Sequence, residues 1–158
     1  MKWDTVAIIG VGLIGGSIGM ALKVRGLARK VIGIGRRPTA LAKAKRLGAV
    51  NATRTDIARG AAEADLVIVC TPVERIAAHV QAAAAASAEG TIITDAGSTK
   101  ASIVAELDGV LPSGVHFVGS HPLAGSEKTG CENGDGDLFA GSVAVVTPSK
   151  TPNKMAAG

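Results

Sequence analysis

Aromatic residues and cysteines are both scarce in this chain, and their scarcity excludes several classes of protein. The aromatic residues are Trp3, Phe117 and Phe139, so we expect no surface that stacks the bases of single-stranded nucleic acid. The two cysteines, Cys70 and Cys131, make no disulfide framework and lack the spacing of metal ligands. We therefore expect no metal site, and we expect a reducing, cytoplasmic location.

The chain also lacks a large excess of charge of one sign and a long apolar run. The net charge is +4, from 17 basic and 13 acidic residues, which suits an anionic small molecule and predicts no nucleic-acid partner. The uncharged run Val6 to Leu22 has seventeen glycine-rich residues, whereas a membrane helix needs about 20 predominantly apolar ones. Asp4 and the lack of a small-residue cleavage site disfavour a signal peptide. We therefore expect no membrane segment.

Hydrophobic residues make up 47% of the 158 residues, which is enough for one domain with a core of Val, Ile, Leu and Ala. Apolar β-branched runs alternate with helical patterns along the chain, which favours a parallel sheet covered on both faces. We expect an α/β, doubly wound Rossmann fold with a mainly parallel sheet and helices on both faces, formed by residues 1–148, with 149–158 as a tail or linker. The expected strands are 5–9, 30–34, 49–53, 65–70, 91–95, 115–118 and 142–147. The first expected helix follows the first strand and ends near residue 25, and the later ones are 39–47, 56–64, 73–87 and 99–111. Residues 119–140 are expected to be irregular.

A glycine pattern follows the first expected strand and opens the first expected helix, which is the context of a dinucleotide-binding turn. Gly10 lets the chain turn sharply, Gly12 lets a pyrophosphate approach the backbone, and Gly15 lets the helix pack on the strand. The free N–H groups at the start of the helix then face the phosphates. A chance match remains the alternative, because this pattern alone is weak.

In a doubly wound sheet the ligand lies beyond the carboxyl ends of the strands. The turns expected there are Gly10–Gly15, Gly35–Arg37, Thr71–Val73, Ala96–Lys100 and Ser120–Glu127. The predicted cofactor-binding residues are Gly10, Gly12, Leu13, Ile14, Gly15, Gly35, Arg36, Arg37, Cys70, Thr71, Pro72, Val73, Gly97 and Ser98.

The end of the second expected strand indicates which dinucleotide is bound. An acidic residue there takes the ribose hydroxyls of NAD, but this chain has Gly35 followed by Arg36 and Arg37. A carboxylate would repel a 2′-phosphate, whereas an arginine fork binds one with two hydrogen bonds. We therefore predict NADP rather than NAD. The alternative is that both arginines are ordinary solvated charges at the start of a helix.

Three motifs occur in a fixed order: VGLIGGS at 11–17, TDAGSTK at 94–100 and GSHPLAGSEKTG at 119–130. Together they resemble the N-terminal dinucleotide-binding domain of the prephenate/arogenate dehydrogenase family of tyrosine biosynthesis, and the resemblance covers essentially all of the chain. It implies an oxidoreductase that transfers hydride from the ring carbinol of a cyclohexadienol to the nicotinamide. Carbon dioxide leaves and the ring becomes aromatic.

The resemblance also implies site residues. His121 corresponds to the histidine that accepts the hydroxyl proton, and Ser98 to the serine that orients the same hydroxyl. Ser126 and Glu127 are expected substrate contacts. Histidine suits a base near neutral pH. The alternatives are a structural loop histidine at 121 and a helix N-cap at Ser98.

Three further residues lie near these motifs. We expect Asp95 and Lys100 to support their turn rather than touch a ligand, with a plain surface ion pair as the alternative. Cys70 ends a strand near the expected nicotinamide position, and we expect a small buried hydrophobic residue there rather than a nucleophile.

Enzymes of the family continue into a helical domain that forms homodimers and completes the substrate pocket, whereas this chain ends at Gly158. The resemblance therefore implies cofactor binding with little turnover for this chain alone. Two other functions stay open, a non-catalytic NADP-binding sensor and another Rossmann-type dehydrogenase. The sequence does not choose between prephenate and arogenate.

Overall fold

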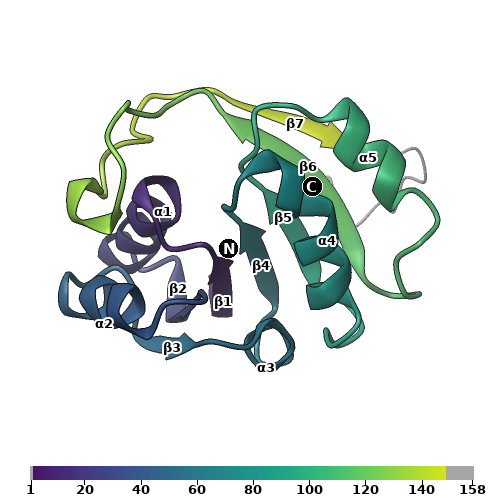
Figure 1. Cartoon of the computed structure of the whole chain (residues 1–158), viewed down its shortest axis with the longest axis horizontal. Helices are drawn as coiled ribbons and strands as arrows, with labels where there is room; N and C mark the ends of the chain where they lie inside the picture. Colours follow the sequence, from purple (N-terminus) through teal and green to yellow (C-terminus); the bar gives the residue numbers. More distant parts are fainter. Residues whose placement is uncertain (1, 149–158) are drawn as a thin grey trace.

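A seven-stranded sheet is the centre of the computed structural model, which describes residues 2–148 (Figure 1). The strand order is β3-β2-β1-β4-β5-β6-β7; neighbouring strands from β1 to β6 pair in parallel, and β7 is antiparallel to β6. The strands are β1 Trp3–Ile9, β2 Ala28–Ile34, β3 Ala52–Arg54, β4 Leu66–Val69, β5 Ile92–Asp95, β6 His116–Pro122 and β7 Ala144–Pro148. The predicted doubly wound, mainly parallel Rossmann sheet is confirmed. The expected tail, 149–158, lies outside the described residues.

Helices cover both faces of the sheet because the strands are apolar on both faces. The helices are α1 Leu13–Val24, α2 Pro38–Arg46, α3 Ile57–Ala61, α4 Val73–Ala84, α5 Ala101–Leu107 and a 3-10 helix, η1, Cys131–Asn133. Successive residues of β1 show the alternation: Ile8 packs in the cluster under α1 and α2, and Ile9 in the cluster under α3, α4 and α5. Both side chains are almost fully buried.

Strand β6 is longer than expected, so the expected irregular segment begins four residues too early. Residues 119–122 continue the strand because β7 pairs with them, with Gly119 opposite Thr147 and His121 opposite Val145. Sequence periodicity cannot show this, since the partner strand is more than twenty residues away. The correction places His121 on a strand rather than in a loop.

Other element boundaries also differ from the expected ones by a few residues, and two of these differences have a visible local cause. The third strand is 52–54 rather than 49–53, because the Asn51 side chain accepts a hydrogen bond from Val31 N and so takes the place of a strand pair. Helix α5 ends at Leu107 rather than Leu111, because Asp108 is extended and Gly109 has a φ of 73°. Neither correction moves a predicted site residue.

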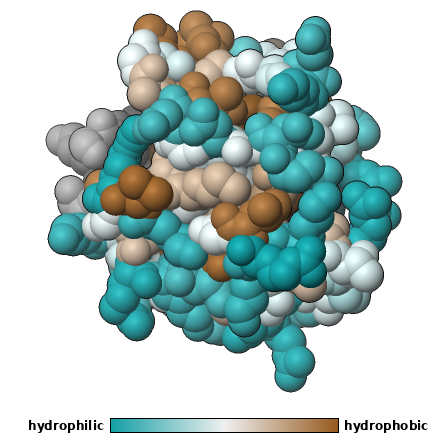
Figure 2. All heavy atoms as spheres, turned by 90° about the vertical axis from the view of Figure 1, so that its left-hand side faces the viewer, coloured by the Kyte–Doolittle hydropathy of each residue, from teal (hydrophilic) through white to brown (hydrophobic). Residues whose placement is uncertain are grey.

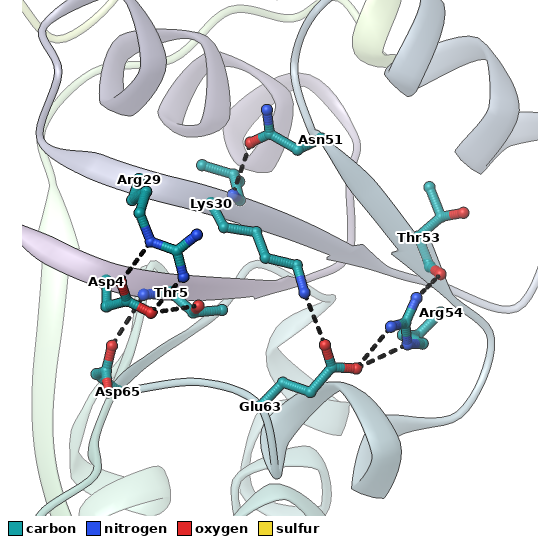
Figure 3. Close-up of polar contacts among 10 residues, drawn as sticks. Asp4, Thr5, Arg29, Lys30, Asn51, Thr53, Arg54, Glu63 and Asp65 are labelled. Atoms are coloured by element: carbon teal, nitrogen blue, oxygen red, sulfur yellow. Dashed lines mark hydrogen bonds and ion pairs between the residues drawn. The ribbon is translucent and has the colours of Figure 1, made fainter.

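Ion pairs join the amino ends of β1 and β2, and they also link β2 and β3 to Glu63 in the segment before β4 (Figure 3). Arg29 pairs with Asp4, and Glu63 accepts from both Lys30 and Arg54. These two cations hold the pKa of the Glu63 carboxyl below its usual value, chiefly through their hydrogen bonds. Exposed pairs of this kind each contribute about 0–1 kcal/mol, so they adjust rather than determine the fold.

The segment between β6 and β7, residues 123–143, crosses back over α1 (Figure 1). Asp135 N donates to the buried Ser17 Oγ at 2.9 Å, and Asp137 pairs with Arg25. Hydrophilic residues cover most of the surrounding face, with hydrophobic residues in small separate groups (Figure 2). We call this segment the β6–β7 connection; it anchors the chain that follows His121 on the helix that opens at the glycine turn.

Candidate functional site

The three glycines of the turn after β1 have different surroundings. Gly10 has a φ of 91°, and a Cβ there would lie 2.8 Å from Cys70 O. A Cβ at Gly15 would lie 2.1 Å from Gly10 O, so α1 packs directly on the turn. A Cβ at Gly12 would meet no atom within 4 Å. Gly10 and Gly15 therefore close the turn, and Gly12 leaves open space above its backbone.

That open space lies at the start of a twelve-residue helix. Gly12 is the N-cap of α1, with no side-chain capping hydrogen bond and no acidic residue in the first turn. The N–H groups of the first turn, which includes Leu13 and Ile14, have no partner within the helix. A pyrophosphate fits such a site, because N–H donors and the positive end of the helix dipole both favour an anion.

The turn after β2 brings two arginines beside the glycine turn. Gly10 N donates to Ile34 O, the last residue of β2, and Gly35, Arg36 and Arg37 follow at once. Both arginines are exposed, and neither has an ion-pair partner among residues 2–148. The guanidinium groups are therefore available to an anionic ligand.

The turn after β4 contacts the glycine turn directly. A Cβ at Gly10 would lie 2.9 Å from Thr71 Cγ2, and Thr71 Oγ1 is 2.9 Å from His79 Nδ1. Pro72 caps α4 without a side-chain hydrogen bond, and Val73 begins the helix. Of the predicted residues of this turn, Cys70 and Thr71 therefore lie against the glycine turn.

Cys70 is unsuited to act as a nucleophile. Burial, with the negative charge of Asp95 as a smaller cause, raises the pKa of its thiol to about 12. The thiolate is the reactive form of cysteine, so this thiol stays neutral and unreactive at ordinary pH. The expectation that Cys70 is no nucleophile agrees with this chemistry, although its side chain is partly rather than fully buried.

Asp95, the last residue of β5, joins two segments of the site. It is 0% exposed, and its carboxylate accepts from Gly97 N at 2.9 Å and Ser120 N at 3.1 Å. The Lys100 ammonium also donates to it, with a side chain only 12% exposed. This is not a plain surface ion pair, because Asp95 is fully buried and the Lys100 side chain is largely shielded from solvent.

Ser98 and His121 each follow a residue whose backbone N–H donates to this carboxylate. Ser98 is exposed and follows Gly97, whereas His121 is partly buried and follows Ser120. The N-cap interpretation of Ser98 is wrong, since α5 begins at Ala101 with Lys100 as its N-cap. The two predicted catalytic residues stand at the carboxyl ends of neighbouring parallel strands.

Ser126 and Glu127 are both exposed in the β6–β7 connection. Ser126 Oγ accepts from Lys128 N at 3.2 Å, which shapes a local turn. A Cβ at the neighbouring Gly125 would lie 4.0 Å from Ile14 Cδ1, in the first turn of α1. The predicted substrate segment therefore runs beside the opening of the cofactor helix.

The sequence did not single out Ser120, although its hydroxyl donates to Asp95 O at 2.5 Å. Thr94 was missed too; its hydroxyl donates to Val118 O at 2.7 Å and to Ser120 Oγ at 3.2 Å. A usable signal was present, since both are small polar residues at the carboxyl ends of apolar strands. The strand was expected to stop at Val118, which hid the position of Ser120.

Another cavity lies outside this site. It has a volume of about 260 Å³ between α2, β3 and α3, and contains none of the predicted site residues. Its lining residues are Pro38, Leu41, Ala42, Thr53, Arg54, Thr55, Asp56 and Arg59. Residues 2–148 hold no cluster of three metal-ligating side chains and no helix long and apolar enough to cross a membrane.

Comparisons with known proteins agree with this geometry. The family model for the nucleotide-binding domain of prephenate dehydrogenase matches residues 18–157. The prephenate dehydrogenase of Bacillus subtilis (strain 168) is 38% identical over 154 residues, which is 97% of this chain and 42% of that protein. The cyclohexadienyl dehydrogenase of Zymomonas mobilis is 36% identical over 143 residues, which is 90% of this chain and 48% of that protein.

Solved structures show the same similarity. The prephenate dehydrogenase of A. aeolicus, in complex with hydroxyphenyl propionate and NAD+, has a TM-score of 0.90 and 32% identity, covering 99% of this chain and 54% of that chain. The arogenate dehydrogenase of Synechocystis has a TM-score of 0.85 and 28% identity, covering 96% of this chain and 52% of that chain. The present chain thus spans about half the length of the relatives it matches.

Proposed function

The chain belongs to the prephenate dehydrogenase nucleotide-binding domain family, and we propose that it provides the cofactor site and the proton acceptor for oxidation of a cyclohexadienol. The substrate is prephenate or arogenate, oxidised by the longest natural protein that carries this chain. One observation carries the proposal: a single buried carboxylate, Asp95, is hydrogen-bonded to both segments that hold Ser98 and His121. The chain that follows His121 then passes the first turn of α1 at Gly125.

The cofactor site in this proposal uses the turns beyond β1, β2, β4 and β5. The first turn of α1 binds the pyrophosphate over Gly12, where open space and unpaired N–H groups coincide. Arg36 and Arg37 bind a 2′-phosphate, and Gly35 leaves no carboxylate to repel it. We therefore propose NADP as the cofactor, although the A. aeolicus relative holds NAD+ in its crystal structure.

The side chains of this chain supply the acid–base part of the reaction. The nicotinamide, when bound, accepts the hydride from the ring carbinol carbon. Ser98 orients the carbinol hydroxyl by a hydrogen bond, and His121 accepts its proton, a step suited to an imidazole near neutral pH. The substrate carboxylate then leaves as carbon dioxide, and its bonding electron pair moves through the ring to the new carbonyl oxygen. The ring becomes aromatic, and this oxygen regains the proton held by His121 to give the phenol. Ser126 and Glu127 contact the substrate from the β6–β7 connection.

This chain covers about half the length of its relatives, so the functions of the full-length enzyme are divided between this domain and the rest. We propose that residues 1–148 form the cofactor-binding unit, and that homodimerisation and part of the substrate pocket belong to the helical domain typical of the family. This chain alone then binds cofactor with little turnover, because positioning of the substrate can supply about 7–11 kcal/mol of a barrier.

The test is turnover of the longest natural protein with prephenate and with arogenate, each with NAD and with NADP. The proposal predicts oxidation of at least one cyclohexadienol, with a higher kcat/KM for NADP than for NAD. An inactive protein that still binds NADP would instead support a sensor function.

A further inference from the structure

Asp95 is an unusual residue within the described part of the chain. Its side chain has no exposed surface, whereas the other side chains there that are both polar and buried are the hydroxyls of Thr5, Ser17 and Thr91. A buried carboxylate loses hydration and persists only when charges and hydrogen bonds compensate for that loss. The partners of Asp95 therefore indicate what its burial achieves.

Those partners come from both segments that carry the proposed catalytic residues. Gly97 N donates to Oδ2 from the position before Ser98, and Ser120 N donates to Oδ1 from the position before His121. The Ser120 hydroxyl donates at 2.5 Å to the carbonyl of Asp95 itself. The carboxylate thus spans the gap between the two strand ends.

Lys100 completes this arrangement through space that two glycines leave open. A Cβ at Gly97 would lie 3.4 Å from Lys100 Nζ, and a Cβ at Gly119 would lie 3.1 Å from Lys100 Cδ. The lysine side chain therefore runs between the turn after β5 and strand β6, and its ammonium neutralises the carboxylate there. The ammonium, two backbone N–H donors and the space left by two glycines therefore all surround the buried Asp95 carboxylate.

We propose that Asp95 is a positioning residue that fixes the turn of Ser98 relative to the strand end of His121, with Lys100 as its counter-ion and Ser120 as its link to β6. This inference rests on the proposed function, because the roles of Ser98 and His121 belong to that proposal. Asp95 acts only through those two residues. A misplacement of about 1 Å in such a pair lowers turnover by about 100-fold, so the constraint has a catalytic consequence.

The test is Asp95→Asn in the longest natural protein, with kcat expressed per NADP-binding site. Asparagine keeps the shape but removes the negative charge opposite Lys100. We therefore expect kcat to fall at least tenfold and the Kd of NADP to rise by a smaller factor, because the turns proposed to bind its phosphates follow β1 and β2. The matched control is Asp65→Asn, because Asp65 also accepts a backbone N–H bond, from Thr5 N at 2.8 Å, at the opposite end of the sheet. We expect that variant to keep its kcat.

Two further variants separate positioning from stability. Asp95→Asn with Lys100→Met removes the unpaired buried ammonium, so thermal stability should recover while kcat stays low. A kcat that recovers together with stability would overturn the proposal. Ser120→Ala is the milder variant and removes the 2.5 Å hydroxyl bond to Asp95 O together with the longer contact from Thr94; we expect a threefold to tenfold loss of kcat with unchanged NADP binding. An unchanged kcat in both Ser120→Ala and Asp95→Asn would also overturn it.

Hydrogen exchange tests the constraint without turnover. The amide protons of Gly97 and Ser120 should exchange at least tenfold faster in Asp95→Asn than in the unaltered protein, and not in Asp65→Asn. Unchanged exchange at both amides would overturn the proposed constraint. If the unaltered protein oxidises neither substrate, the proposed function and the proposed effect of Asp95 on kcat are both overturned. Amide hydrogen exchange would still decide whether Asp95 holds the two segments together.

Discussion

A methyl group added at Gly12 or at Gly15 would meet opposite surroundings within one turn. At Gly15 it would lie 2.1 Å from a backbone carbonyl, and at Gly12 it would enter open space. A side chain at Gly15 would therefore clash within the fold, whereas a side chain at Gly12, three residues earlier, would take up space proposed for the ligand. The same small side chain serves packing at one position and approach of a phosphate at the other.

This contrast predicts opposite results for two alanine substitutions. Gly15→Ala should destabilise the fold by at least about 1–3 kcal/mol, because a backbone contact must move. Gly12→Ala should keep the melting temperature nearly unchanged but weaken NADP binding at least tenfold, because its methyl occupies the space above the helix start. Thermal unfolding and a fluorescence titration with NADPH measure both effects. Normal NADPH affinity in a folded Gly12→Ala variant would contradict the proposed phosphate position.

The arginines after β2 give a second prediction at this scale. A hydrogen bond to a charged group contributes about 1.5–3 kcal/mol, so Arg36→Ala should weaken NADP binding by about 10–100-fold. Binding of NAD should change little, because NAD has no 2′-phosphate. Arg46→Ala, at the far end of α2, is the matched control. Isothermal titration with both cofactors is the measurement, and equal affinity for NAD and NADP in the unaltered protein would refute the NADP assignment.

Cys70 gives a prediction about pH. Its pKa in the folded protein, about 12, lies above the ordinary value of 9.0, so the folded state keeps a proton that the unfolded state loses. The contribution of this group to the free energy of unfolding is therefore full below pH 9 and declines as the pH rises from 9 toward 12. Alkylation by iodoacetamide at pH 8, followed by mass spectrometry, should leave Cys70 unmodified in the native protein. Rapid native modification would show that the thiol is not held neutral.

At the scale of elements, the sequence predicted what local patterns determine and missed what distant partners determine. The glycine turn, the Asp56 cap of α3 and the buried strand β4 follow from nearby residues, and the structure has all three. The end of β6 depends on pairing with β7, and the start of β3 on the side chain of Asn51. Burial of Asp95 depends on Ser120, 25 residues away.

The contact between η1 and α1 is an interaction between elements that can be tested. A Cβ at Gly16 would lie 2.7 Å from Cys131 Sγ, so Gly16→Ala should destabilise the protein by about 1–3 kcal/mol through overpacking. Cys131→Ala removes the sulfur, and the double variant should regain much of that loss. A double-mutant cycle from denaturant unfolding measures the coupling. Strict additivity of the two single effects would show that η1 does not pack on α1 in this way.

At the scale of the whole molecule, the fold brings chemically different turns to one end of a parallel sheet. The proposed phosphate-binding backbone follows β1, two arginines follow β2, and the proposed proton acceptor lies at the end of β6. The order of the strands, rather than the order of the residues, makes these segments neighbours. This chain spans 42% of the Bacillus subtilis relative, so the longest natural protein is the appropriate subject for any measurement of turnover.

The central claim is that cofactor binding and proton acceptance are separate functions of this one domain. His121→Asn in the longest natural protein tests it most directly, because asparagine keeps polarity at position 121 but cannot act as the base. We expect a loss of oxidation of about 100-fold or more, in the range ascribed to general base catalysis, with the Kd of NADP unchanged within a factor of two. Turnover within tenfold of the unaltered protein, or loss of NADP binding together with turnover, would contradict it.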